Sequence, residues 1–162
     1  MKKILSLPTV IVFLITFLVA GGCGSPLERD NCVIKNTKRV KIYLKAIVQN
    51  GEKHLQMYDS NDTTKLVVDD LETCVMPGMK VIWKRAKNSG IKKITKIGPK
   101  NAGKIIIKDA TRVLFTKKFK LKIPKKAPYN TEEKYDIDFL DKDSKPHSID
   151  PYLKIPKKQA DT

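Results

Sequence analysis

Lysine and apolar side chains alternate strictly over residues 118–123, and this two-residue period constrains the fold more than any other feature. Successive side chains of a β-strand point to opposite faces, so such a segment buries one face and exposes a row of lysines. A helix, with its longer period, would mix the two kinds of side chain on every face. The exposed row would contain Lys118, Lys120 and Lys122, with Pro124 ending the strand.

The same alternation recurs along the chain between turn signals. Residues 40–48 and 135–139 alternate in the same way, and Asn50-Gly51, Pro77-Gly78 and residues 141–144 are typical turn sequences. No window carries a helical stripe longer than about two turns. Many short strands separated by turns predict an all-β fold, an antiparallel β-sandwich of roughly seven to nine strands.

The N-terminal segment has the features of an export signal rather than of a folded domain. A basic start, Met1–Lys3, precedes an apolar run of 17 residues from Ile4 to Ala20, which is short for a membrane-spanning helix of about 20 residues. The run closes with small residues and Cys23. An ordinary secretory signal that happens to contain a cysteine is the alternative to the interpretation that follows.

The segment Val19-Ala20-Gly21-Gly22-Cys23 resembles the lipobox of bacterial lipoproteins, although Ala20 stands where leucine is usual. The resemblance implies cleavage before Cys23, palmitate-type acyl chains on its sulfur and attachment to a membrane of the cell envelope. Two or more acyl chains suffice for stable anchoring, at about 0.8 kcal/mol per buried methylene. Ser25 is not the aspartate that marks inner-membrane retention in some lipoproteins, which favours the periplasmic side of the outer membrane.

These features divide the chain into four parts. Residues 1–22 form a cleaved signal helix, and residues 23–30 the lipidated cysteine and a tether. Residues 31–156 form a single sandwich domain, and residues 157–162 a polar tail. A mature chain of about 140 residues is long enough for one core of ordinary size.

Two cysteines remain after Cys23, namely Cys32 and Cys74. Disulfides form in oxidising compartments outside the cytosol, so an exported chain with two remaining cysteines favours a bridge between them. Two buried free thiols are the alternative.

A Pro-Gly turn within residues 73–78, the following strand at 81–83, and a terminal hairpin over 135–151 together resemble a cupredoxin-like sandwich. The resemblance is strongest to copper-free bacterial relatives of unknown function. Blue-copper sites use two histidines, a cysteine thiolate and a weak axial methionine, usually gathered on one late loop. The candidate ligands here, in the order His54, Cys74, Met79 and His147, do not form that loop. We therefore predict no metal and no cofactor, with a cupredoxin-type metal or redox carrier as the alternative function.

Positive charge is concentrated in one segment. Residues 79–128 contain 17 Lys or Arg and one acid, Asp109, within a chain of 33 Lys+Arg and 17 Asp+Glu. The row at Lys118, Lys120 and Lys122 is the candidate surface for anionic lipids or envelope polyanions. Few aromatic residues and four arginines argue against nucleic acid as the partner. Solubility, protection of sheet edges and genome composition are the alternative explanations.

Two further patterns have the residue types of catalytic or metal sites. His147-Ser148-Ile149-Asp150 contains the residues of a hydrolase triad, but neighbours on a strand point to opposite faces. Residues 141–144 begin like a calcium loop that then lacks the required glycine and glutamate. The sequence predicts no enzyme; a small hydrolase is the weakest alternative to a binding or scaffolding lipoprotein whose protein partner is unidentified.

Overall fold

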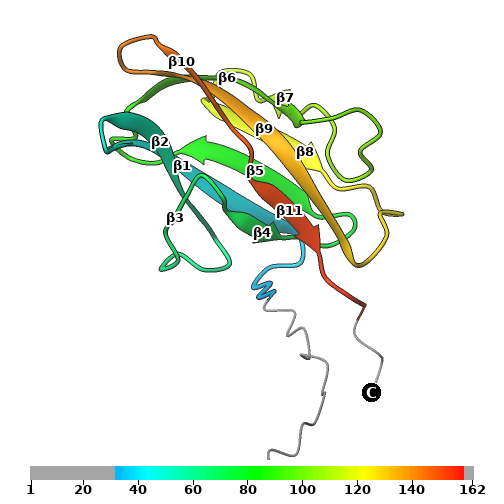
Figure 1. Ribbon diagram of the computed structural model, residues 1–162. Coiled ribbons are helices and arrows are strands. Elements are labelled where there is room, and N and C mark those ends of the chain that lie inside the picture. The colour runs from blue at the N-terminus through cyan, green and yellow to red at the C-terminus, as the bar shows by residue number, and fades with distance from the viewer. Residues whose placement is uncertain (1–31, 159–162) are drawn as a thin grey trace, which may run out of the picture.

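The structure, a computed structural model, describes residues 32–158. Within this range the chain forms β-strands and loops, and the strands build two sheets that pack face to face (Figure 1). The all-β sandwich expected from the sequence is confirmed. The eleven strands are β1 (Arg39–Gln49), β2 (Glu52–Asp59), β3 (Val67–Val68), β4 (Glu72–Cys74), β5 (Lys80–Arg85), β6 (Ile91–Pro99), β7 (Thr111–Arg112), β8 (Lys118–Lys122), β9 (Thr131–Asp141), β10 (Pro146–Ile149) and β11 (Tyr152–Ile155).

The first sheet has six strands in the order β3-β2-β1-β5-β8-β7. β1 and β2 form an antiparallel hairpin, and both residues of its turn, Asn50 and Gly51, have positive φ, at 53° and 83°. This is the geometry that an Asn-Gly hairpin turn requires. β5 then runs parallel to β1, so the sheet is mixed rather than wholly antiparallel.

The second sheet is built around β9, the long strand that pairs with three others. β6 pairs along one part of β9, while β10 and β11 follow each other along it and β4 pairs parallel with β11. Asp150 and Pro151 separate β10 from β11. Proline cannot donate to a ladder, which explains why the chain along this side of β9 is divided into two strands.

β6 shows how a three-residue spacing can occur in a strand. Ile91, Ile94 and Ile97 are buried although they are three residues apart. The register against β9 shifts between Ile91 and Lys93 and again between Ile94 and Lys96. Each irregularity adds a residue to the strand and restores the inward direction for the next isoleucine.

The core lies between the sheets and contains one polar link across it. Trp83 of β5 and Tyr135 of β9 are fully buried, and the Trp83 Nε1 donates to the Tyr135 hydroxyl at 2.9 Å. Burial raises the pKa of Tyr135 far above its ordinary value, so the hydroxyl stays neutral. The link gives each of these two buried polar groups a hydrogen-bond partner.

A disulfide joins Cys32 to Cys74, as predicted from the export signal. It connects the segment that leads into β1 to the end of β4, and so it crosslinks the two sheets near one end of the sandwich. Residues 32–38 and the C-terminal end of β11 lie at this end, opposite the turn between β9 and β10 (Figure 1).

The predicted signal peptide at 1–22, Cys23 and the tether at 23–30 lie outside the described residues. Within residues 32–158, no helix has the length and apolar character needed to cross a membrane.

Candidate functional site: a basic face and a basic cavity

β8 places its lysines as the alternation predicts. Phe119 and Leu121 are buried, whereas Lys118, Lys120 and Lys122 are exposed on the outer side of the six-stranded sheet. The two buried side chains pack into the core beside Trp83, which keeps the opposite face of β8 turned to solvent.

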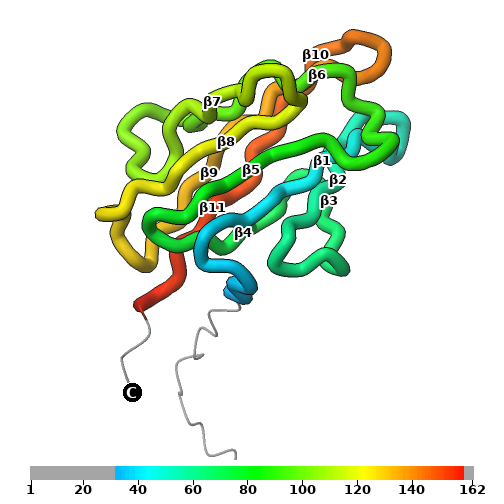
Figure 2. The backbone as a smooth tube through the Cα atoms, turned by 180° about the vertical axis from the view of Figure 1, so that it is seen from behind, coloured from blue at the N-terminus to red at the C-terminus, as the bar shows by residue number. Residues whose placement is uncertain are grey.

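The neighbouring strands extend this row across the sheet. In the β5–β8 ladder Lys80 lies opposite Lys122 and Lys84 opposite Lys118. In the parallel β1–β5 ladder Arg39 is aligned with Lys80. Figure 2 shows β1, β5 and β8 side by side on the near side of the molecule. We call this surface the basic face; its cations are Arg39, Lys41, Lys45, Lys80, Lys84, Lys118, Lys120 and Lys122.

The basic face contains no acidic partners among the residues that the structure describes. Its eight cationic side chains take part in no ion pair within residues 32–158. Lys84 instead lies over the Tyr43 ring, with its Nζ 4.2 Å from the centroid, and Tyr43 stacks on Tyr58 at 4.6 Å. A cation over an aromatic face keeps its charge while its stem covers apolar surface.

The outer side of the five-stranded sheet is different, because acids lie among its lysines and form ion pairs with some of them. Asp150 binds both Lys100 and Lys134, and Glu72 lies 3.5 Å from the Nζ of Lys154. Hydrogen bonding to Lys100 lowers the pKa of Asp150. Hydrogen bonds to Tyr152 and to Asp150 raise the pKa of Lys134. Each shift favours the charged form of its group, as expected when a charged group lies beside a charge of opposite sign.

An open cavity of about 640 Å³ lies at one end of the basic face. Lys84 and Lys118 belong to both, and the wall is completed by the turn between β5 and β6 and by the β9–β10 turn. The cationic residues of the lining are Lys84, Arg85, Lys92, Lys117, Lys118 and Lys142, and the lining includes no acid. We call this the basic cavity.

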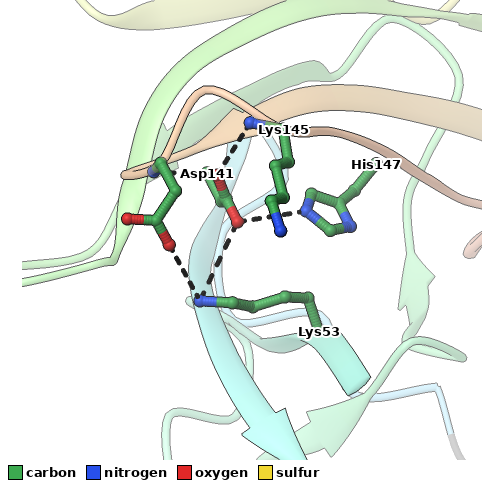
Figure 3. A network of polar contacts seen from close by, with 5 residues as sticks. Lys53, Asp141, Lys145 and His147 are labelled. Carbon is green, nitrogen blue, oxygen red and sulfur yellow. Dashed lines mark hydrogen bonds and ion pairs between the residues drawn. The ribbon is translucent and has the colours of Figure 1, made fainter. Parts of the chain in front are cut away.

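Near the cavity, a buried carboxylate fixes the β9–β10 turn (Figure 3). The Asp141 side chain is fully buried and accepts hydrogen bonds from the backbone amides of Asp143 and Lys145, both at 2.9 Å. His147 contacts it at 3.2 Å and Lys53 of β2 at 3.8 Å. Burial opposes ionisation, but these hydrogen bonds outweigh it and lower the pKa of Asp141. The Asp141 carboxylate thus uses its oxygens to hold the β9–β10 turn, which explains its place in the sequence without a calcium ion.

The candidate copper ligands have other partners. Cys74 is bonded to Cys32, which removes the thiolate that a blue-copper site needs. His54 Nδ1 lies 2.6 Å from Asp69, and His147 contacts Asp141. One group of metal-ligand residue types lies within the described range, and it consists of Cys32, Glu72 and Cys74. Because the two cysteines form the disulfide, only the Glu72 carboxylate is left in this group as a metal ligand.

The triad-like segment also separates as the alternation predicts. His147 stacks on Phe139 and binds Asp141, whereas the Ser148 hydroxyl donates to Asp138 at 2.7 Å on the outer side. Asp150 is paired with lysines. The three residues therefore do not converge on a reacting atom.

The sequence missed much of the basic face. The expected row on β8 is present, but Arg39, Lys41 and Lys45 come from β1, far outside the basic segment at 79–128. Their place depends on the parallel pairing of β1 with β5, for which the sequence gives no local signal. Models of known protein families and curated proteins, compared with the chain, give no match.

Proposed function

We propose that the protein is a bacterial envelope lipoprotein, anchored through acyl chains on Cys23, whose sandwich binds an anionic membrane surface without catalysing a reaction. The observation that carries the proposal is the basic face, with eight cations and no ion pair among the described residues. The lipobox-like segment supports the anchor, and Ser25, which is not the aspartate of inner-membrane retention, favours the periplasmic side of the outer membrane.

The arrangement of the cations argues against edge protection as their role. Lysines that prevent edge-to-edge pairing lie on edge strands. Five cations of the basic face lie on β1 and β5, which are paired on both sides. Like charges directly opposite one another on a sheet lower the stability of the fold. Protection of sheet edges cannot explain this loss of stability on β1 and β5, because neither is an edge strand.

The electrostatics suit a lipid surface. A lysine close to an anionic membrane contributes about 1 kcal/mol, and the field extends over a Debye length of roughly 8 Å at physiological salt. A flat sheet face brings several cations within that distance together. The acyl chains supply the anchoring, and the basic face determines how the domain is oriented on the membrane.

Chain length permits this orientation. Eight residues lie between Cys23 and Cys32 in the sequence. At about 3.5 Å per residue they span at most roughly 30 Å. This length is similar to that of β1, about 36 Å for its eleven residues, so an anchored domain can lie with its basic face toward the lipid.

Vesicle binding by the non-lipidated mature chain, beginning at Gly24, tests the proposal. This chain retains the disulfide and the whole buried core. It should bind vesicles containing phosphatidylglycerol but not pure phosphatidylcholine vesicles, and rising salt should weaken the binding. Replacing Lys118, Lys120 and Lys122 by Gln should weaken binding. The matched control replaces Lys65, Lys96 and Lys145, which are also exposed, and should have a smaller effect. Equal binding to both kinds of vesicle would contradict the proposal.

A further inference from the structure

The turn between β7 and β8 exposes two large apolar side chains beside the basic cavity. Leu114 is 77% exposed and Phe115 is fully exposed. Both lie within residues 113–117, and Lys117 at the end of this turn lines the cavity. We call Leu114 and Phe115 the apolar tip.

Local folding does not explain the apolar tip. Phe115 has a φ of 57°, in the left-handed region that a bulky side chain rarely adopts. The turn is held by other groups, since the backbone amide and hydroxyl of Thr116 both donate to the Val113 carbonyl, at 3.2 and 2.9 Å. A glycine or asparagine at position 115 would suit this backbone better. The phenyl ring is therefore exposed at a position where folding favours a small or polar residue.

Cations precede and follow the tip in the chain, because Arg112 ends β7 and Lys117 comes just before β8. A second hollow, of about 250 Å³, shares Arg85, Lys92 and Lys117 with the basic cavity and adds Lys93 and Arg112. Arg85 is held in place by hydrogen bonds from its guanidinium to the carbonyl groups of Ile91 and Lys92. The linings of both hollows lack acids. An exposed Leu-Phe pair in a turn between Arg112 and Lys117, which line these hollows, matches the two layers of an anionic membrane, apolar chains beneath negative headgroups.

We propose that the apolar tip inserts among the acyl chains of an anionic membrane while the basic cavity binds the phosphate groups of its lipid headgroups. The inference rests on the proposed function and names the part of the surface that enters the lipid. The basic cavity is continuous with the basic face through Lys84 and Lys118, so both contact the same membrane. The domain is then held at two places: the acyl chains are on Cys23, which precedes Cys32 at one end of the sandwich, and the tip follows β7 at the other end.

Insertion makes part of the binding insensitive to salt. Charge attraction weakens as ionic strength rises, whereas burial of Leu114 and Phe115 in lipid does not. Wild-type mature chain on phosphatidylglycerol vesicles should retain measurable binding at high salt. A variant with Leu114→Ser and Phe115→Ser should bind at least about tenfold more weakly and be released completely by salt. The matched control, Val33→Ser with Leu66→Ser, removes two other exposed apolar side chains and should bind like wild type.

A fluorescent reporter separates this inference from the proposed function. Phe115→Trp should shift its emission to the blue on phosphatidylglycerol vesicles and be quenched by lipids brominated along the acyl chain. Trp83 is fully buried and gives a constant background. Binding without a shift or quenching would overturn the insertion and leave the basic face as the binding surface. Absence of any vesicle binding by the wild-type chain would overturn both.

The cavity and a competing role of the tip are tested in the same assay. Lys117→Gln with Lys142→Gln should lower affinity for phosphatidylglycerol vesicles by about tenfold, and more than Lys65→Gln with Lys126→Gln. An equal loss of affinity in both double variants would overturn the assignment of the basic cavity to lipid headgroups.

Self-association is the competing role of the apolar tip. If the protein forms a dimer in sedimentation, and the Leu114→Ser, Phe115→Ser variant abolishes this dimer with vesicle binding unchanged, the tip serves self-association instead.

Discussion

The outer sides of the two sheets differ in how their charges are arranged: acids pair with lysines on one side, and cations lie opposite cations on the other. On the five-stranded sheet Asp150 joins Lys100 and Lys134, and Glu72 lies beside Lys154. On the six-stranded sheet Lys80 and Lys84 directly oppose Lys122 and Lys118. On the five-stranded side, ion pairs within the chain lower the electrostatic energy. On the six-stranded side, the cations repel one another, and a negatively charged partner would reduce this repulsion.

The largest expected effect concerns the bond that holds the two sheets together. Replacing Cys32 and Cys74 by Ser opens a loop with a sequence separation of 42 residues. The chain-entropy argument gives a loss of about 4 kcal/mol in the free energy of unfolding. Denaturant unfolding of the mature chain measures it. Vesicle binding at low temperature, where the variant stays folded, should be retained, because the cations of the basic face lie on β1, β5 and β8 and none of them is at a bridged position. Loss of binding in a folded variant would mean that the face depends on the crosslink.

Removing charge from the basic face should stabilise the fold while it weakens binding. Lys118→Gln, Lys120→Gln and Lys122→Gln relieve two like-charge pairs across the β5–β8 ladder. We expect the free energy of unfolding to rise by about 0.5 kcal/mol at low salt, with a smaller rise at high salt. Thermal unfolding at two ionic strengths measures the difference. A fall in stability at both salt concentrations would show that these lysines are not in mutual repulsion.

Acid should weaken the five-stranded side first. The pKa of Asp150 in the folded protein lies below its ordinary value of 3.8, so the unfolded chain takes up this proton at a higher pH. The ion pairs of Asp150 therefore contribute fully above about pH 5, and their contribution is lost as the pH falls through 3.8 and then through the lower pKa of the folded state. Asp150→Asn should reduce the loss of stability between pH 5 and 3, followed by thermal unfolding. If Asp150→Asn and the wild-type chain lose the same stability between pH 5 and 3, the ion pairs of Asp150 do not stabilise the five-stranded side.

The sequence predicted the elements whose pattern is local. The alternation at 118–122 identified β8 and the direction of its side chains, and Asn50-Gly51 identified the first hairpin. β6 was less clear, because its isoleucines are three residues apart and only the irregular register against β9 makes them share a face. The residues of β6 alone do not indicate where the strand bulges against its neighbour.

The complete basic face could not be predicted, because it depends on strand order. Lys41 and Lys120 are 79 positions apart in the sequence and meet on one surface because β5 lies between their strands. The apolar tip had a weaker signal, a Leu-Phe pair between Arg112 and Lys117. The exposure of these two side chains depends on the shape of the turn and on the direction of the side chains, and neither can be predicted from the residue types alone.

Lysine acetylation footprinting tests the central claim most directly, because both sides of the molecule are measured in one sample. The mature chain is labelled with and without phosphatidylglycerol vesicles, and each lysine is quantified by mass spectrometry. The account predicts that vesicles protect Lys80, Lys118, Lys120 and Lys122, while Lys96 on β6 and Lys65 in the loop before β3 stay reactive. Equal protection of the two groups, or protection of Lys96 alone, would contradict it.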